Sequence, residues 1–208
     1  VDGFIRDKVK EFDARHAKYG SSVYILEPNI KEGEGGLRDI HTALWVSKAR
    51  FKAGTFRQLM KKGVITPKEL RFFERSTEFL FRVRNELHYL SGRKNDQMMF
   101  DYQEKIAAFM GFRDTGQHLA VEGFMRGYYI YARNISQFSR MLIKRASAGP
   151  GIGGRLLHKI IQRDIGEGFK VFHNSVTVTS PLLFEKNPYL IMKAFELSQR
   201  HALPLSDF

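Results

Sequence analysis

The sequence contains no cysteine, and other features that define common protein classes are missing as well. Without cysteine the chain can form neither disulfide bonds nor thiolate metal sites, which is compatible with the reducing cytoplasm where we expect the protein. No apolar run approaches the roughly 18–20 residues of a membrane span. The N-terminal residues VDGFIRDKVK lack a signal peptide's continuous apolar stretch and an initiator methionine, so we expect a piece of a longer chain.

Motifs that define common catalytic sites are also missing from the sequence. It has no G-x-x-x-x-G-K-[ST] phosphate loop, no H-E-x-x-H zinc site and no G-x-S-x-G nucleophile elbow. It has no Asp-x-Asp pair to hold two metal ions, and its seven histidines are scattered without ligand spacing. We therefore do not expect a complete enzyme within these residues.

Positive charge is present in excess. The 34 lysines and arginines outnumber the 22 aspartates and glutamates and give a net charge of +12. Such an excess favours anionic partners, namely nucleic acid, nucleotide phosphates or an acidic protein surface. The longest basic clusters, however, are dipeptides such as Lys61-Lys62 and Lys144-Arg145 beside predicted helix ends, where cations complement the helix dipole without a ligand. A solvated surface and a functional patch both remain open.

Hydrophobic periodicity predicts a mainly α protein that folds as a helical bundle. Apolar residues at helical spacing predict helices over residues 3–18, 37–52, 55–62, 66–91, 101–110, 117–146 and 187–202. The start at Thr66 is the best defined, because TPKE at residues 66–69 has the pattern of a capping box with proline at the first helical position. Long amphipathic helices joined by short loops are typical of a bundle.

Two regions predict β structure, and a third predicts a boundary. SVYILE at residues 22–27 predicts a single N-terminal strand. FKVF at 169–172 and SVTV at 175–178 predict a small C-terminal β-hairpin around His173-Asn174. SAGPGIGG at residues 147–154 has four glycines and a proline, a composition typical of a connection between domains.

The stretch EPNIKEGEGGLRDI, residues 27–40, is the strongest candidate for chemistry. If the chain stays extended through Lys31, then Glu27 and Lys31 share one face, where a carboxylate could hold a metal ion and an ammonium group a phosphate. The three glycines that follow allow a ligand to approach the backbone closely, and a helix beginning at Leu37 would present free N–H groups to an anion. The alternative is a plain strand–turn–helix connection in which the glycines only relieve strain.

This stretch resembles a segment of the bifunctional uridylyltransferase/uridylyl-removing enzymes, whose pattern is E-P-N-[IV]-K-E-G-x-G-G-L-R-D-[IL]. The variable position, often proline in the family, is Glu34 here, which we expect to make the turn less rigid and more acidic. The matched positions are Glu27, Pro28, Asn29, Lys31, Glu32, Gly33, Gly35, Gly36, Leu37, Arg38 and Asp39.

A second stretch, residues 79–111, is similar to the pattern F-L-x-x-V-R-x-x-L-H-x-x-x-G-R-x-x-D-x-x-x-F-x-x-Q of the same family. A vaguer similarity covers residues 121–135. Two long patterns in the right order identify the chain as a member of this family. The matched positions of the second pattern are Phe79, Leu80, Val83, Arg84, Leu87, His88, Gly92, Arg93, Asp96, Phe100 and Gln103.

The resemblance implies a helical domain of the nucleotidyltransferase substrate-binding type. Residues 1–36 would be the end of the nucleotidyltransferase core with a connecting loop, and residues 37–146 the bundle. Residues 147–208 would be a linker, a hairpin and a helix leading towards a metal-dependent HD phosphohydrolase domain. The family's reaction transfers UMP from UTP to a tyrosine of the nitrogen-signalling protein PII, with Mg²⁺ between phosphates and carboxylates.

The resemblance also indicates which residues would serve the site of the parent enzyme. Glu27 is the candidate third carboxylate, by analogy with a related adenylyltransferase family, and the alternative is a glutamate that caps a turn. For Asp39, in the first helical turn, the helix dipole alone would favour a carboxylate. The candidates for contact with the triphosphate or with PII are Lys31, Gly35, Gly36, Arg38 and Asp39.

Four polar residues of the second pattern have two interpretations; they are Arg84, His88, Arg93 and Asp96. They form either an internal polar network, which we favour because buried polar groups usually pair, or a substrate contact. No complete metal site lies in this chain, so the resemblance implies that Mg²⁺ is held elsewhere in the parent enzyme.

A basic helical module that binds nucleic acid is the alternative function, and the net charge suggests it. Such a module requires a contiguous basic stripe with exposed aromatic side chains, and its affinity falls steeply with salt. The predicted core faces hold most of the aromatic residues, which favours the transferase interpretation. No membrane partner is expected, and the oligomeric state is left open.

We predict that the isolated 208-residue chain, mixed with UTP, Mg²⁺ and PII, transfers no UMP, because it contains no Asp-x-Asp pair to hold metal ions. Transfer of radiolabelled UMP to PII measures this, with a sample lacking the chain as control. Turnover by the purified chain above that control would contradict the prediction.

Overall fold

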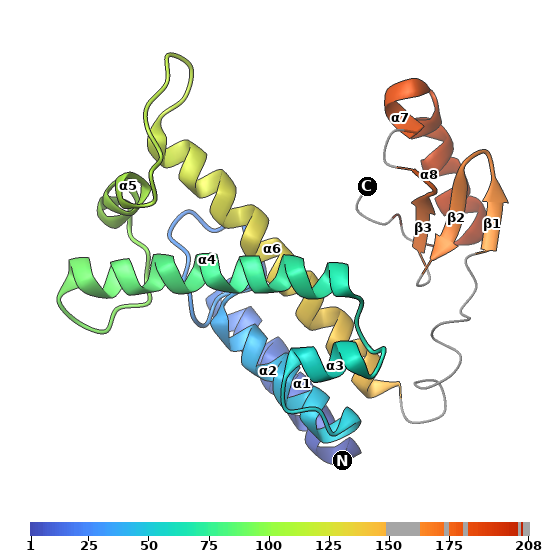
Figure 1. Ribbon diagram of the computed structural model, residues 1–208, viewed down its shortest axis with the longest axis horizontal. Helices are drawn as coiled ribbons and strands as arrows, with labels where there is room; N and C mark the ends of the chain where they lie inside the picture. Colours follow the sequence, from blue (N-terminus) through green and yellow to red (C-terminus); the bar gives the residue numbers. More distant parts are fainter. Residues whose placement is uncertain (149–162, 173–174, 181–182, 204, 206–208) are drawn as a thin grey trace. The chain divides into compact units, whose positions relative to one another are not determined.

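The chain is mainly helical with a small antiparallel sheet near its C-terminus, as a computed structural model shows (Figure 1), and this confirms the predicted fold class. It divides into two compact units, Val1–Gly149 and Pro150–Phe208. No helix of the described ranges combines the length and the apolar character that a membrane crossing requires. The structure describes residues 1–148, 163–172, 175–180, 183–203 and 205.

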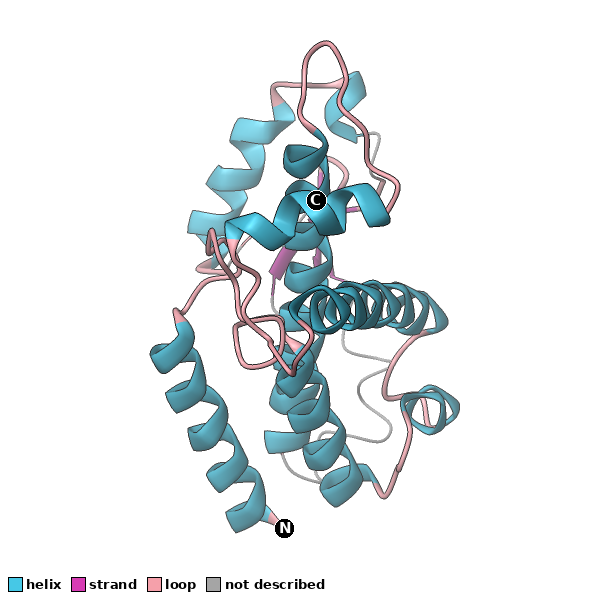
Figure 2. Cartoon of the chain, turned by 90° about the vertical axis from the view of Figure 1, so that its left-hand side faces the viewer, coloured by secondary structure: helices cyan, strands magenta, loops and turns pink. Residues whose placement is uncertain are grey.

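Helices dominate the first unit (Figure 2). Each begins and ends within three residues of the predicted bounds. Helix α2 packs along α6, α4 crosses α6, and α1 lies beside α2 (Figure 1). The helices are α1 (Asp2–Tyr19), α2 (Leu37–Phe51), α3 (Phe56–Lys61), α4 (Pro67–Ser91), α5 (Phe100–Phe109) and α6 (Ala120–Ser147).

Helix α4 shows how local sequence signals set the ends of these helices. The hydroxyl of Thr66 accepts a hydrogen bond from the N–H of Glu69 at 3.1 Å, and the carboxylate of Glu69 accepts one from the N–H of Thr66 at 2.5 Å. These two bonds confirm the predicted capping box. The helix ends at Ser91 and is followed by Gly92, whose φ of 61° is the left-handed conformation that glycine adopts at little cost.

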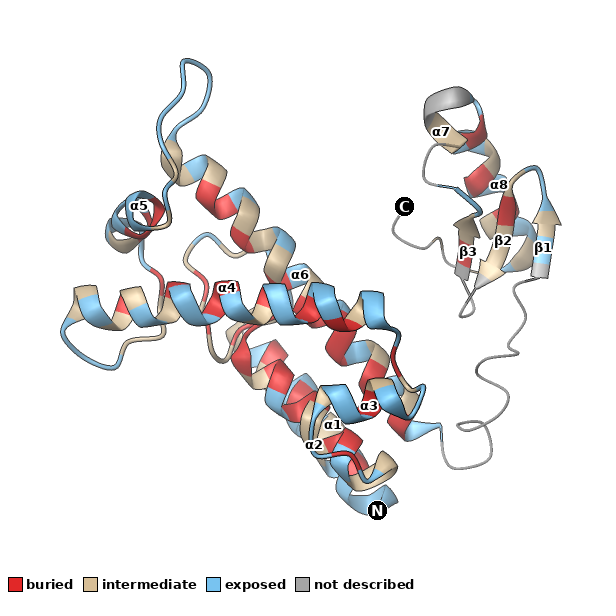
Figure 3. Ribbon diagram, viewed as in Figure 1, coloured by how far each residue is buried: buried red, intermediate tan, exposed pale blue. Residues whose placement is uncertain are grey.

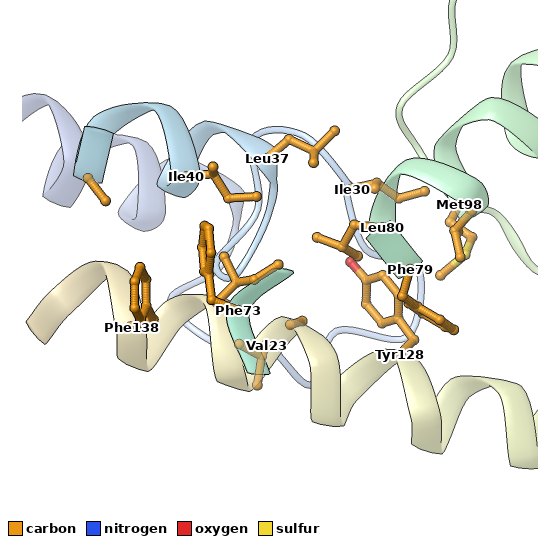
Figure 4. Packing of buried hydrophobic residues seen from close by; sticks show 14 of the residues in the cluster. Val23, Ile30, Leu37, Ile40, Phe73, Phe79, Leu80, Met98, Tyr128 and Phe138 are labelled. Carbon is orange, nitrogen blue, oxygen red and sulfur yellow. The ribbon is translucent and has the colours of Figure 1, made fainter. Parts of the chain in front are cut away.

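The core of the first unit lies where α2, α4 and α6 meet. Buried residues line the facing sides of these helices, and exposed residues cover their outer sides (Figure 3). Phe73 of α4 stacks on Phe138 of α6 with ring centroids 4.2 Å apart (Figure 4). Phe56 meets both rings edge-on. Tyr128 of α6 and Leu80 of α4 are buried further along the same contact.

The second unit pairs a small sheet with two helices. Its elements are β1 (Arg163–Gly166), β2 (Phe169–Phe172), β3 (Ser175–Val178), α7 (Leu183–Lys186) and α8 (Leu190–His201). The strands lie in the order β1-β2-β3, and all pairs are antiparallel. Pairing of Phe169 with Val178 and of Lys170 with Thr177 confirms the predicted hairpin. Its turn, His173-Asn174, lies outside the described residues.

Strand β1 has no signal in the sequence. RDIG shows no alternation of apolar and polar residues, and it pairs with β2 through a register that shifts between Asp164 and Gly166. The sheet therefore has one strand more than the predicted hairpin. Residues 149–154 of the predicted boundary lie outside the described residues.

The predicted N-terminal strand over residues 22–27 is wrong. None of these residues belongs to a strand, and the backbone carbonyls of residues 25–27 take other partners. They accept hydrogen bonds from the side chains of Tyr129, Gln103 and Gln97. SVYILE is rich in β-forming residues, but a strand requires a neighbouring strand, and side-chain donors satisfy its backbone here.

Replacing Phe73 with alanine is expected to destabilise the first unit by about 3–5 kcal/mol, the usual cost of deleting a buried phenylalanine ring. Phe73 is 3% exposed, whereas its neighbour Phe72 is 51% exposed. Phe72→Ala is therefore the matched control, with an expected change within about 1 kcal/mol. Urea unfolding followed by the fluorescence of Trp45, the only tryptophan, measures both. Equal losses would show that the stacked rings do not stabilise the core.

Candidate functional site

The two stretches that resemble the family lie against each other. Residues 27–39, the glycine-rich loop with the first turn of α2, contact residues 96–103, which lead into α5. The N–H of Ile30 donates a hydrogen bond to the carbonyl of Asp96 at 2.8 Å. We call these two segments together the seam. Residues far apart in the sequence therefore form one structure.

Asn29 folds the first half of the loop into a tight turn. Its side-chain oxygen accepts hydrogen bonds from the N–H groups of Lys31 at 3.2 Å and of Glu32 at 2.8 Å. An asparagine that bonds the backbone two residues on is typical of a turn. The chain is therefore not extended through Lys31, and the strand geometry predicted to place Glu27 and Lys31 on one face is absent.

The first N–H groups of α2 are already bonded within the loop. The N–H of Leu37 donates to the carbonyl of Ile30 at 3.0 Å, and the N–H of Arg38 donates to the carbonyl of Lys31 at 2.9 Å. The N–H of Asp39 also has a carbonyl partner. The expectation of free N–H groups at this helix start is therefore wrong, because the loop itself satisfies them.

Glycine is required in the loop for close packing. Gly35 has a φ of +73°, and a Cβ there would lie 2.1 Å from the carbonyl oxygen of Ala132 in α6. At Gly36 a Cβ would lie 2.7 Å from the carbonyl oxygen of Ile30. Both glycines are buried. They bring the loop against α6 and against itself, whereas a phosphate cradle would need them to face a ligand.

Asp39 is a fully buried carboxylate that connects the loop to α1. One carboxylate oxygen accepts a hydrogen bond from Arg15 at 2.7 Å and lies 2.9 Å from Nε2 of His16. The other accepts the N–H of Gly35 at 2.8 Å. A buried charge requires such compensation. With 0% exposure, Asp39 has an internal role instead of the surface position that ligand contact requires.

Glu34, at the variable position of the family pattern, fastens the loop to α6. Its Oε1 accepts hydrogen bonds from Ser136 at 2.8 Å and from Arg140 at 2.9 Å. Arg140 also lies 3.3 Å from Nδ1 of His16. The loop is therefore held in place and its extra charge is paired. Sequence reasoning missed Arg140 and His16, because no local pattern connects them with a loop elsewhere in the chain.

Lys31 and Arg38 are the predicted contact residues of the loop that reach the surface. Their side chains are 27% and 30% exposed, and they lie 3.6 and 3.1 Å from Oε1 of Glu32. Burial alone would raise the pKa of Glu32, but a hydrogen bond from Arg38 and the charge of Lys31 outweigh it and lower that pKa. Ionised Glu32 therefore holds two cations side by side.

Asp96 connects α4 with the seam. Arg84 donates a hydrogen bond to the carboxylate of Asp96 at 2.6 Å, and Nε2 of His88 lies 3.2 Å from the same oxygen. Burial would raise the pKa of Asp96, but hydrogen bonds from Arg84 and His88 lower it below its usual range. Among the residues that the structure describes, exposed Arg93 stays outside this network.

His41, on α2, shows that the two charge clusters share one electrostatic environment. Burial lowers its pKa first, and the positive charges of Arg38, Lys31 and Arg84 lower it further. Cations from both family patterns therefore act on one imidazole. We call this surface the basic face; its residues are Lys31, Arg38, His41, Arg84 and His88.

Glu27 caps helix α5. Its carboxylate accepts a hydrogen bond from the N–H of Phe100, the first residue of α5, at 2.9 Å, where the helix dipole favours an anion. Within the described ranges no group of three or more histidines, aspartates or glutamates could hold a metal ion.

The fold and the seam together define a helical domain with a charged surface of paired side chains. A family model described as GlnD PII-uridylyltransferase matches residues 3–143. The chain belongs to this family, which confirms the resemblance seen in its two patterns.

Curated relatives are similar over nearly the whole chain. The bifunctional uridylyltransferase/uridylyl-removing enzyme of Ruegeria pomeroyi is 36% identical over 199 residues, which cover 95% of this chain and 22% of the relative. The enzyme of that name from Nitrosococcus oceani is 37% identical over 201 residues, which again cover 95% of this chain and 22% of the relative. The one from Nitrobacter hamburgensis is 30% identical over 210 residues, which cover 96% of this chain and 23% of the relative. The chain thus spans about a fifth of these relatives. No solved structure matches it.

Replacing Asp39 with alanine is expected to destabilise the first unit by about 3–5 kcal/mol, since Arg15 and His16 would lose their shared buried partner. Urea unfolding followed by Trp45 fluorescence measures the loss. Asp13→Ala, which removes an exposed carboxylate from α1, is the control and should change stability by no more than about 0.5 kcal/mol. An effect at Asp39 as small as in the control would mean that this carboxylate does not anchor the loop.

Proposed function

We propose that this chain is the helical part of an enzyme that transfers UMP from UTP to a tyrosine of PII, and that its basic face completes the nucleotide cleft and helps to present PII. The observation that carries the proposal is the pair of part-exposed cations, Lys31 and Arg38, on one carboxylate in a chain of this family. In this proposal residues 1–36 close the transferase core, residues 37–146 form the bundle, and residues 147–208 lead towards the HD domain.

The basic face suits the triphosphate of UTP. As pyrophosphate leaves, negative charge accumulates in the transition state, and cations in fixed positions stabilise it. The carboxylate of Glu32 keeps Lys31 and Arg38 close together. In this proposal an incoming phosphate replaces Glu32 as the partner of both cations. The bonds of Asp39 and Glu34 behind the loop hold the backbone that carries these cations.

In this proposal the other predicted residues shape the loop or extend the basic face. Gly35 and Gly36 act from inside, because they allow the loop to pack against α6 and against itself. Arg84 and His88 extend the basic face from α4, with Asp96 as the carboxylate that orients them. Contact with the triphosphate is therefore assigned to side chains and not to backbone N–H groups.

Metal ions are assigned to another part of the enzyme. Phosphoryl transfer uses magnesium held by several carboxylate and phosphate oxygens. Glu27 is left out of that site, because its carboxylate caps α5. We accordingly propose that the isolated chain is inactive, and that the reaction takes place in the cytoplasm, where UTP is used.

A nucleic-acid-binding module is the weaker alternative. The net charge of +12 favours it. However, Arg38 of the basic face is paired with Glu32, and Arg84 with Asp96, which differs from the open basic stripe that a nucleic-acid backbone needs. Membership of the PII-uridylyltransferase family supports a protein-modifying transferase instead.

In the full-length enzyme, Lys31→Ala and Arg38→Ala are each expected to lower kcat/KM for UMP transfer by about 1–3 kcal/mol of transition-state stabilisation, the range for a charge-assisted contact. Transfer of radiolabelled UMP to PII at subsaturating UTP measures this. Arg57→Ala is the matched control: Arg57 is 77% exposed, pairs with Glu74 and lies outside the basic face, so its loss should change the rate little.

Support for this assignment requires slower UMP transfer with an unchanged melting temperature and unchanged uridylyl removal. Normal transfer rates in both variants would make the seam purely structural. So would the loss of both activities together with unfolding.

A further inference from the structure

A groove on the first unit shares no residue with the basic face. Its volume is about 450 Å³, and it lies between Tyr24 and one stripe of α6. Residues three, four and seven apart lie on one side of a helix, so the stripe is continuous over about three turns. The residues of the stripe are Glu122, Met125, Arg126, Tyr129, Ile130 and Arg133.

Two apolar residues of the lining are exposed. Tyr24 is 60% exposed and Ile130 is 52% exposed. The rings of Tyr24 and Tyr129 meet edge to face with centroids 5.5 Å apart, and the hydroxyl of Tyr129 donates a hydrogen bond to the carbonyl of Ile25 at 3.2 Å. The groove therefore has a fixed wall. Exposed aromatic and aliphatic side chains within a polar rim are typical of protein docking sites.

The rim of the groove carries two cations without a partner among the described residues. Arg126 and Arg133 are exposed and seven residues apart on α6, so their side chains leave the same face roughly 10 Å apart. Arg140, seven residues further along the same row, is instead paired with Glu34. Glu122, the acidic residue at the other end of the groove, accepts a hydrogen bond from the N–H of Leu119 and so caps α6.

We propose that this groove docks PII through an acidic segment that carries an apolar side chain between its carboxylates. The identity of the partner rests on the proposed function. Two carboxylates roughly 10 Å apart can reach Arg126 and Arg133, while the apolar side chain covers Tyr24 and Ile130. An enzyme that modifies a protein gains affinity from such contacts away from the reacting tyrosine.

The test is the double variant Arg126→Ala/Arg133→Ala in the full-length enzyme. The affinity for fluorescently labelled PII, measured by anisotropy without UTP, is expected to fall roughly tenfold, because two charge contacts at the rim are lost. The KM for PII should rise by a similar factor, with kcat and the KM for UTP unchanged. The dependence of the affinity on salt should flatten, since exposed ion pairs are screened by salt.

A matched control is Arg75→Ala/Arg82→Ala, which removes two exposed arginines seven residues apart from α4. It should leave the affinity for PII and its salt dependence unchanged. Tyr24→Ser tests the apolar part of the groove: the affinity for PII should fall several-fold while its dependence on salt is kept. Thermal unfolding of each variant shows whether it remains folded.

An unchanged affinity for PII in the double variant overturns the docking site. A higher KM for UTP at an unchanged affinity for PII would show a nucleotide site and overturn it as well. If the unsubstituted enzyme binds PII but transfers no UMP, the proposed function fails by itself. The anisotropy measurement still decides whether PII binding depends on the two arginines.

Discussion

The buried carboxylate of Asp39 is the interaction on which the candidate site depends. A charge with no exposure is tolerated only where fixed partners compensate it, and here they are Arg15, His16 and the N–H of Gly35. The first two lie on α1, the third lies in the loop, and the carboxylate itself lies on the first turn of α2. One side chain therefore fixes the relative positions of three elements. The part-exposed cations of the loop, Lys31 and Arg38, lie on a backbone that this carboxylate holds in place.

The loop differs from a phosphate-binding loop in how its backbone is used. In a phosphate loop the N–H groups at a helix start face the ligand. Here the N–H groups of Leu37, Arg38 and Asp39 are bonded to carbonyls of the loop, and Gly35 faces the backbone of α6. The backbone thus gives rigidity, and in the proposed function the contacts with a ligand are made by side chains. This explains why a stretch with three glycines can serve a charged surface without acting as a cradle.

The net charge of +12 is less informative than which of the lysines and arginines are paired with carboxylates. On the basic face, Arg38 is paired with Glu32 and Arg84 with Asp96, so each cation is oriented by a carboxylate. On α6, by contrast, the exposed cations beside Tyr24 lack such carboxylates among the described residues. A paired cation is pre-oriented for one ligand group, whereas an unpaired exposed cation gains most from a partner that supplies the missing charge. The same residue types therefore form two different kinds of surface, one with paired and one with unpaired cations.

Helix positions, the capping box at Thr66 and the pairing of β2 with β3 could be predicted from the sequence, because each depends on residues within a few positions of one another. The family could also be recognised, since each of its two patterns is an unbroken stretch of sequence. The strand expected at residues 22–27 and the free N–H groups at the start of α2 were wrong. The burial of Asp39, a candidate for ligand contact, was not foreseen. Only the tertiary structure decided which partners residues 22–27 and Glu34 take, because those partners lie far away in the chain: Gln103 is 77 residues from Leu26, and Arg140 is 106 residues from Glu34. The N–H groups at the start of α2 have partners only a few residues away, but the tight fold of the loop that brings them together has no simple sequence signal. Burial and the pairing of distant charges are properties of packing, and no local spacing of residues encodes them.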